Sequence, residues 1–283
     1  MNYSKFLYVV AFATVLFTAC GNDSSTSANN SNDGEISSKS SSSSAKSSSS
    51  SVAKSSSSRK TVSSSSGKVA ELVDPADVIV GSMTDSRDGQ TYKTVTIGEQ
   101  TWMAQNLNYE TADSYCYNDT SSYCAKYGRL YTWAAAMDSV GSWSVNGNGC
   151  GYGSTCSPTG TIRGVCPEGW HLPTKSEWEI LFDAVGGISI AGMVLKSTSG
   201  WNEYEGHDGN GTDAFSFSVL PAGDRYYGWL YDGGEGDLAS FWSSAEYDSD
   251  FAYRMDLFYS REEARMQCYG PKNFENSVRC LKD

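Results

Sequence analysis

Cysteine is the residue type whose number and spacing in this chain indicate the most definite chemistry. The chain of 283 residues contains 8 cysteines, and seven of them follow Cys20. Cys116 and Cys124 lie close together in the sequence, as do Cys150 and Cys156, so each pair can close one short loop through a disulfide. Such a framework is typical of exported domains, in which oxidising conditions keep disulfides formed. Sequence distance alone leaves three cysteines unassigned: Cys166, Cys268 and Cys280.

Metal-binding and catalytic motifs are absent from the sequence. There is no C-x-x-C pair, and His171 and His207 are the only histidines, so we do not expect a zinc site. No Walker loop, G-x-S-x-G or H-E-x-x-H pattern occurs. The many carboxylates could supply an acid and a base, but the sequence does not bring any two of them together. We therefore predict neither an enzyme nor a cofactor.

One acidic loop resembles the beginning of a calcium site. Residues 208–213 read D-G-N-G-T-D, an oxygen-rich run without the glycine position and the distal glutamate of an EF-hand. A solvated acidic loop is the favoured interpretation, and calcium is the alternative. The acids nearby that could add ligands are Asp224, Asp232, Glu235 and Asp237.

The segment from Trp201 to Asp237 carries the best candidates for ligand binding, because it places aromatic rings among glycines and acids. Flat rings with polar edges bind sugars or protein partners well, although each ring could instead pack into the core. Tyr226, Tyr227 and Trp229 are so close in sequence that they cannot all point inward. We predict binding through Tyr226, Tyr227, Trp229 and Tyr231, with hydrogen bonds from Asp224 and Asp232.

Residues 1–20 read as a lipoprotein signal peptide. Lys5 precedes an apolar run from residue 6 to residue 17, which is shorter than the roughly 20 residues that span a bilayer. Residues 16–20, L-F-T-A-C, resemble a bacterial lipobox, in which the cysteine is lipidated, so Cys20 is the expected anchor. By resemblance to enterobacterial lipoprotein sorting, Gly21 rather than Asp after this cysteine favours delivery to the outer membrane. An ordinary secretory leader is the alternative.

Residues 21–68 are predicted to be a disordered linker, because they are nearly all serine and offer little apolar surface to bury. The charge of the chain changes sign after this segment. Residues 1–68 hold seven basic and three acidic residues, whereas the remainder holds 14 basic and 30 acidic residues. An acidic domain without a basic stripe repels phosphate backbones, so we exclude nucleic acid as a partner.

A helix that follows Thr174 is the best-defined element of the chain. Thr174 and Glu177 have the spacing of a capping box, and Gly186-Gly187 provides a C-terminal stop. His171 precedes the helix in an extended segment, where we interpret it as a packed, hydrogen-bonded residue. The apolar residues between the two ends recur with helical spacing: Trp178, Leu181, Phe182 and Val185.

Weaker patterns place the other elements. Residues 91–97 and 100–104 flank Gly98-Glu99 and predict a hairpin with a two-residue turn. A spacing of three to four predicts a first helix over residues 130–137, and residues 142–164 read as loop. The other predicted strands cover residues 215–219, 241–242, 253–259 and 278–281.

Several sequence blocks resemble a known family. Residues 170–178, W-H-L-P-T-K-S-E-W, are similar to a signature of formylglycine-generating-enzyme-like and C-type-lectin-like domains. The other blocks are D-S-R-D-G at 85–89, Q-T-W-M-A-Q-N-L at 100–107, Y-G-R-L-Y-T-W at 127–133, F-W-S-S at 241–244 and S-V-R-C at 277–280. Together they resemble the Fibrobacter succinogenes major paralogous domain family over residues 84–282. The resemblance implies an α+β, C-type-lectin-like domain with two helices, short antiparallel strands and long loops, and it implies no activity.

The resemblance also assigns the remaining cysteines. A bridge between Cys166 and Cys280 would resemble the one that closes lectin-like domains, and it leaves Cys268 as a free thiol. Formylglycine-generating enzymes carry a reactive cysteine pair late in the chain. Here Cys280 fits the structural S-V-R-C block, and Cys268 has no neighbouring histidine to lower its pKa. The calcium signatures of lectins are absent.

These observations favour an outer-membrane lipoprotein, held at the surface of the cell envelope by Cys20, that displays a lectin-like binding module on a flexible linker. The membrane is its expected partner through the lipid, and the expected ligand is a carbohydrate or a protein. One alternative is a formylglycine-generating-type enzyme with altered cysteine chemistry. The other is a structural protein of the cell envelope.

Overall fold

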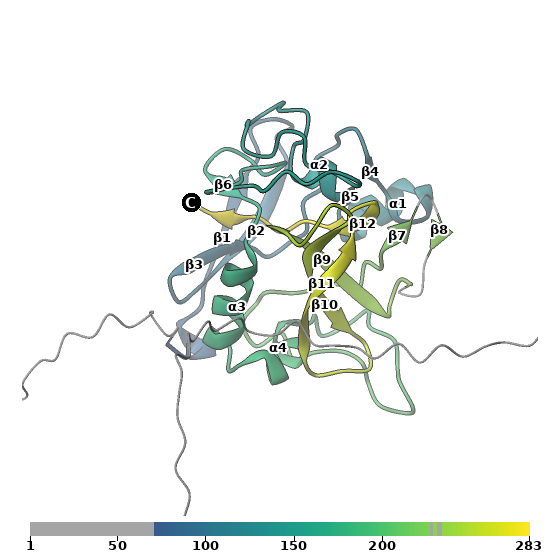
Figure 1. The fold of residues 1–283 in the computed structure, drawn as a ribbon. Coiled ribbons are helices and arrows are strands. Elements are labelled where there is room, and N and C mark those ends of the chain that lie inside the picture. Colours follow the sequence, from purple (N-terminus) through teal and green to yellow (C-terminus); the bar gives the residue numbers. More distant parts are fainter. Residues whose placement is uncertain (1–70, 227–228, 231–233) are drawn as a thin grey trace, which may run out of the picture. The chain divides into compact units, whose positions relative to one another are not determined.

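The computed structural model describes residues 71–226, 229–230 and 234–283, with the backbone alone for residues 229–230. Within these residues the chain has the predicted α+β class, with two β-sheets and four α-helices (Figure 1). The helices are α1 (Ser121–Tyr127), α2 (Trp133–Ala136), α3 (Lys175–Ala184) and α4 (Ile188–Leu195), and two short 3₁₀ turns are η1 (Pro75–Asp77) and η2 (Tyr117–Asp119).

The two sheets join strands from both ends of the domain. The first is antiparallel, in the order β1 (Ile79–Thr84), β2 (Thr91–Ile97), β3 (Gln100–Met103), β13 (Leu281–Lys282) and β6 (Trp170–His171). The second has the order β11 (Ala264–Pro271), β10 (Phe251–Phe258), β9 (Leu238–Glu246), β12 (Phe274–Ser277), β5 (Leu130–Thr132) and β4 (Ser114–Tyr115). A short hairpin, β7 (Arg225–Tyr226) and β8 (Trp229–Leu230), pairs with β12.

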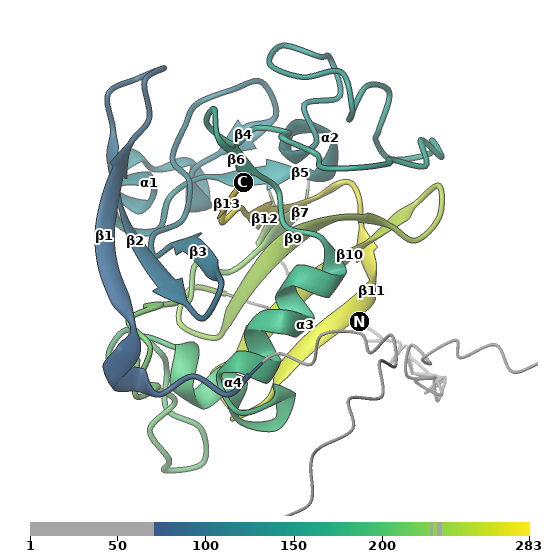
Figure 2. The ribbon, with the colours of Figure 1, turned by 90° about the vertical axis from the view of Figure 1, so that its left-hand side faces the viewer.

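The predicted hairpin and central helix are confirmed. β2 and β3 pair around Gly98, whose φ of 60° suits the first position of the predicted turn. The N-cap Thr174 and Glu177 form a complete capping box at the start of α3. The apolar face of α3 packs between the two sheets (Figure 2). The Trp178 ring lies 4.6 Å from the Trp102 ring of β3 and 5.8 Å from the Phe241 ring of β9.

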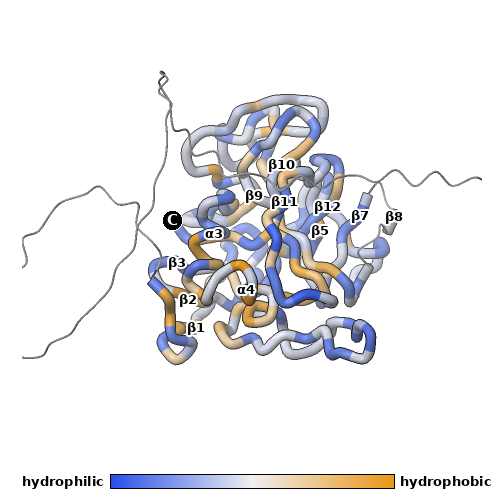
Figure 3. Tube along the Cα trace, turned by 60° about the horizontal axis from the view of Figure 1, so that its bottom comes forward, coloured by the Kyte–Doolittle hydropathy of each residue, from blue (hydrophilic) through white to orange (hydrophobic). Residues whose placement is uncertain are grey.

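The helix α4 was not predicted. Its residues, ISIAGMVL, are apolar without a helical period, so they resemble a buried strand as much as a helix (Figure 3). Tertiary packing decides between the two, since Gly192 lies so near the backbone of residues 262–263 that a Cβ would meet the Glu262 oxygen at 2.6 Å. The helix predicted over residues 130–137 is instead the strand β5 followed by the short α2. The expectation of two helices was therefore wrong.

No single helix among the described residues is long and apolar enough to cross a membrane. α3 and α4 meet the length and composition criteria only when taken together, and the pair is bent by 80°.

The strand predicted over residues 215–219 is absent. Phe215, Phe217 and Val219 are buried as their alternation indicated, but Ser216 and Ser218 both have φ of 54°, which a strand does not allow. Asp213 holds this irregular backbone, because its carboxylate accepts hydrogen bonds from the Ser218 N–H and hydroxyl. Alternating burial is therefore a property of the side chains here and does not report an extended backbone.

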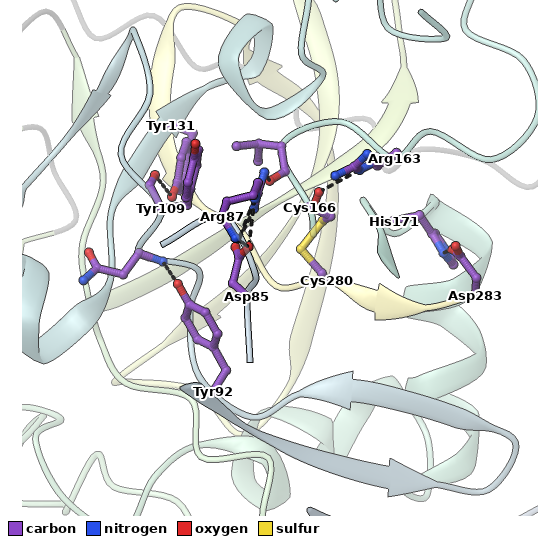
Figure 4. Close-up of a disulfide and its surroundings, with 12 residues drawn as sticks. Asp85, Arg87, Tyr92, Tyr109, Tyr131, Arg163, Cys166, His171, Cys280 and Asp283 are labelled. Carbon is purple, nitrogen blue, oxygen red and sulfur yellow. Dashed lines mark hydrogen bonds and ion pairs between the residues drawn. A yellow bond between two sulfur atoms is a disulfide. The ribbon is translucent and has the colours of Figure 1, made fainter. Parts of the chain in front are cut away.

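The ends of the domain differ from the predicted ones. Before Thr84, the strand β1 pairs along its whole length with β2, and Val73 N–H donates to the Ala184 carbonyl, so the folded part begins before the predicted start. Of the strand predicted over residues 278–281, only Leu281 lies in a strand, β13, and residues 278–280 connect β12 to β13. Between them, the disulfide Cys166–Cys280 joins the segment before α3 to the C-terminal segment (Figure 4).

A three-residue ionic cluster fixes the segment in front of α3. His171 Nδ1 lies 2.8 Å from Asp283 Oδ1, and its Nε2 lies 3.0 Å from Glu177 Oε1. Only a doubly protonated ring can donate to both carboxylates. Burial by itself lowers the pKa of His171, but the hydrogen bonds to Glu177 and Asp283 outweigh it and raise the pKa above 6.5. The prediction of a packed, hydrogen-bonded histidine is confirmed.

We predict that this cluster makes stability depend on pH. The pKa of His171 is raised by folding, so its contribution is complete below 6.5 and is lost as pH rises through the folded value. The pKa of Glu177 is lowered, since its hydrogen bonds outweigh burial, so its contribution is lost as pH falls below 4.5. Denaturant unfolding at several pH values should show that the cluster contributes most to the free energy of unfolding between pH 4.5 and pH 6.5. His171→Gln should remove most of the decline from pH 6.5 to pH 8.5, and exposed His207→Gln should not. Equal slopes in both variants would contradict the assignment.

Candidate functional site

The ligand segment predicted from the sequence is only partly described. Tyr227, Tyr231 and Asp232 lie outside the described residues, and Trp229 is known from its backbone in β8. Tyr226 is half-buried on β7, with its ring 4.9 Å from the ring of Phe274. Its ring is therefore partly used in packing.

Asp224 was predicted to form hydrogen bonds with a ligand, which needs a surface position, but the side chain is buried. It is 3% exposed, and its Oδ2 lies 3.3 Å from Arg254 Nη1. The same guanidinium lies 3.3 Å from Asp256, which accepts a hydrogen bond from the Ser240 hydroxyl at 2.7 Å. Burial raises the pKa of Asp256 although Arg254 opposes it. The named candidates all lie in residues 224–237, here called the candidate segment. This buried cluster fixes the beginning of that segment to the sheet, because a charge without its partner there would be costly.

The other end of the candidate segment is fixed to α1. Glu235 Oε1 accepts hydrogen bonds from the Tyr127 hydroxyl at 2.6 Å and from Lys126 Nζ at 3.0 Å. The backbone N–H of Glu235 donates to the Tyr117 hydroxyl at 3.0 Å. Burial disfavours ionisation of Glu235, but the hydrogen bonds from Tyr127 and Lys126 outweigh it and lower its pKa. Glu235 is therefore ionised at neutral pH and holds the end of the candidate segment against α1.

A pocket of about 210 Å³ lies directly beside the contacts of Glu235 with α1. It is bounded by α1, the end of β3 and the C-terminal segment. Lys126 and Tyr127 both bind Glu235 and line the pocket. The other lining residues are Gln90, Tyr92, Lys93, Ala104, Gln105, Asn106, Asn108, Cys124, Ala125, Gly128, Ser218, Leu220 and Arg279.

Asn106 and Arg279 are the buried polar groups that hold this pocket together. The Asn106 amide donates to the Tyr127 carbonyl and the Ser277 hydroxyl, and its oxygen accepts from Arg279 Nε at 2.9 Å. Gly128 packs so closely that a Cβ would meet the Cβ of Asn106 at 2.8 Å, so no larger residue fits there without movement. α1 is thereby held against the end of β3.

Sequence reasoning did not identify this pocket, although the signal was present. Residues 100–107, 127–133 and 277–280 served only as marks of a family, and in the fold all three contribute to the pocket wall. Their meeting could have been expected if the blocks had been taken as parts of one site. Aromatic residues were chosen instead as the predicted binding site, because they are easier to recognise in a sequence.

The three predicted disulfides are confirmed, and the predicted free thiol is not. The structure contains Cys116–Cys124, Cys150–Cys156 and Cys166–Cys280. Cys268 is buried in β11 and is also disulfide-bonded. The expectation of a free thiol at Cys268 was therefore wrong.

The acidic loop considered for calcium makes local contacts. Asp208 Oδ1 accepts from the backbone N–H and the side-chain amide of Asn210, and Asp213 binds Ser218. Among the residues that the structure describes, no group of three or more His, Cys, Asp or Glu side chains is arranged to hold a metal ion.

We predict that Asn106→Ala lowers the free energy of unfolding by about 2–4 kcal/mol, because it leaves a buried guanidinium N–H without an acceptor and removes two further hydrogen bonds. Gln105→Ala is the matched control, since Gln105 is exposed and accepts one hydrogen bond, from the Lys93 N–H. Urea unfolding of both variants measures the difference. A loss below about 1 kcal/mol for Asn106→Ala would show that the pocket does not depend on this residue.

Comparison with protein families supports the resemblance seen in the sequence blocks. The family model of the Fibrobacter succinogenes major domain matches residues 95–282. No curated protein and no solved structure matches the chain. Since the match covers 188 of the 283 residues, including the whole second sheet and α3, the chain belongs to the Fibrobacter succinogenes major domain family.

Proposed function

We propose that this chain is a surface lipoprotein that displays a C-type-lectin-like module, and that this module binds carbohydrate at the pocket beside α1 and at the adjoining segment 224–237. The observation that supports this proposal most directly is the position of Glu235. It belongs to the candidate segment and binds Tyr127 and Lys126, which line the pocket. The segment and the pocket are therefore neighbours and can form one binding surface.

The lectin-like assignment is supported by the way in which the loops are held. α3 packs between the two sheets, and the Cys166–Cys280 bridge closes the domain across 114 residues of sequence. By the loop-entropy model such a bridge contributes about 4–5 kcal/mol. A scaffold of this kind can carry long binding loops, because functional residues concentrate on loops that a rigid core positions.

The chemistry of the pocket suits the hydroxyl groups of a sugar. Gln90, Gln105 and Asn108 place amides along its wall, and Ser218 adds a hydroxyl. Asn108 Oδ1 is buried and has no hydrogen-bond partner among the described residues, so a ligand hydroxyl donating to it would satisfy it. A volume of about 210 Å³ is below the ~300–1,000 Å³ of drug-sized sites, which fits a single sugar ring.

The segment before the domain supports attachment to a membrane. The apolar run that ends at Cys20 has the length of a signal peptide, and L-F-T-A-C has the pattern of a lipobox. Lipidation there would place the acidic domain on a serine-rich linker at the outer membrane. Stable anchoring by more than one acyl chain is consistent with such a site.

For the anchor, we expect Cys20→Ser to abolish lipid attachment and to move the protein from the membrane fraction to the soluble fraction. Metabolic labelling with a fatty acid and membrane fractionation measure both effects. A variant that stays in the membrane fraction would contradict the lipoprotein assignment. Asn22→Ser is the control, since it lies outside the lipobox.

For the binding site, a glycan array with the full chain should identify carbohydrate ligands. Asn108→Ala should weaken binding of the best glycan by about 1–2 kcal/mol through loss of hydrogen bonds. Trp229→Ala should weaken it by about 2 kcal/mol or more if segment 224–237 supplies a hot spot. Gln267→Ala on β11, which does not line the pocket, is the control. The proposal fails if no glycan binds, or if Asn108→Ala and Trp229→Ala both leave affinity unchanged in folded protein.

A further inference from the structure

Arg279 is a buried cation without a carboxylate partner among the described residues. It is 1% exposed, and no Asp or Glu of the described chain lies within ion-pair distance of it. Its guanidinium donates to Asn106 Oδ1 and to the carbonyl oxygens of Phe217 and Ser218. A guanidinium carries five N–H donors, so these three bonds to neutral acceptors leave two donors without a hydrogen bond among the described residues. The rings of Phe217 and Phe241 lie beside the guanidinium, and Asp213 acts on its charge only from beyond ion-pair distance.

Other buried cations in the described structure are compensated. Arg225 pairs with Glu275, Arg254 lies beside two aspartates, and Lys272 lies 2.6 Å from Glu246. Lys196 is a second exception, but three backbone carbonyls surround its Nζ and it does not line the pocket. Among these cations, Arg279 is the one that lines the pocket, and no carboxylate is in direct contact with it among the described residues.

The whole pocket is cationic within an acidic domain. Its lining residues include Lys93, Lys126 and Arg279 and no carboxylate. Glu235 neutralises Lys126, whereas Lys93 is exposed and has no ion pair among the described residues. Burial lowers the pKa of Arg279 to about 9, so the guanidinium stays protonated at neutral pH. Two positive charges, those of Lys93 and Arg279, therefore line the pocket without a carboxylate in direct contact among the described residues.

We propose that the pocket recognises a carboxylate-bearing sugar, a uronic acid residue, whose carboxylate lies between Lys93 and the guanidinium of Arg279. This inference rests on the proposed carbohydrate-binding function and names the class of sugar. Charge-assisted hydrogen bonds from Arg and Lys to a carboxylate are about twice as strong as neutral ones. The amides of the pocket bind the ring hydroxyls, and the two cations select the acid.

The charge of the domain restricts the ligand further. Residues 69–283 hold 30 acidic and 14 basic residues, so a polymer with a carboxylate on every unit would be repelled outside the pocket. The favoured ligand is thus an otherwise neutral glycan with an isolated uronic acid at its end or on a branch. The same repulsion disfavours phosphate-rich polymers.

The test compares two matched oligosaccharides by calorimetry with the full chain. One is neutral except for a single terminal glucuronic acid, and the other has that carboxyl group reduced to the alcohol. We expect the acidic probe to bind at least about tenfold more tightly, the effect of one charge-assisted hydrogen bond. Lys93→Gln should remove much of this preference, and the exposed control Lys282→Gln should keep it.

Asn106→Asp provides a second variant, because it places a carboxylate next to Arg279 Nε and should abolish the preference for the acidic probe. If this variant does not fold, the result with Lys93→Gln decides the question, since Lys93 is exposed. Equal affinity of the two probes overturns the uronic acid inference and leaves the carbohydrate function intact. A preference that survives Lys93→Gln also overturns it. Binding of neither probe, together with an empty glycan array, rejects both proposals.

Discussion

The buried guanidinium of Arg279 is the interaction on which the candidate site depends. It joins the C-terminal block to Asn106 after β3 and to the irregular backbone at Phe217 and Ser218. Through Asn106 the same network reaches Tyr127 at the end of α1. These segments are far apart in sequence, and each supplies an acceptor that a buried cation cannot lose without a large cost. The pocket exists because these segments meet around one charge.

The same principle fixes the long loops elsewhere in the domain. Lys272 lies within hydrogen-bond distance of Glu246 and of the Ser154 carbonyl, and Glu246 accepts the backbone N–H groups of residues 156 and 157. The loop clipped by Cys150–Cys156 is thereby tied to the second sheet. The candidate segment is held in the same way, since Asp224 at its beginning binds Arg254 and Glu235 near its end binds Tyr127. A domain with few helices can hold long loops in place in this way.

Local signals were sufficient for some elements and not for others. The helix α3 and the β2–β3 hairpin depend on a capping box and on a glycine in the turn, which act over four residues or fewer. Residues 188–195 and 215–219 carry no such signal. The first are apolar throughout, and the alternation in the second indicates which side chains are buried but does not fix the backbone. Packing of Gly192 against the backbone near residue 262 selects a helix in the first, and Arg279 selects an irregular turn in the second.

By itself, the sequence determined the α+β class, the family, three disulfides, the central helix and the acidic character of the domain. Most of these depend on residue types, short spacings or total charge, whereas the long-range Cys166–Cys280 pairing followed only from the family resemblance. Only the tertiary structure decided that Asp224 is buried, that Cys268 is bonded, and that the blocks at residues 100–107, 127–133 and 277–280 surround one pocket. Burial and ion pairing depend on which segments meet in space. Asn106 and Arg279, which meet in the pocket wall, are separated by 173 residues, so short-range patterns carry no information about their contact.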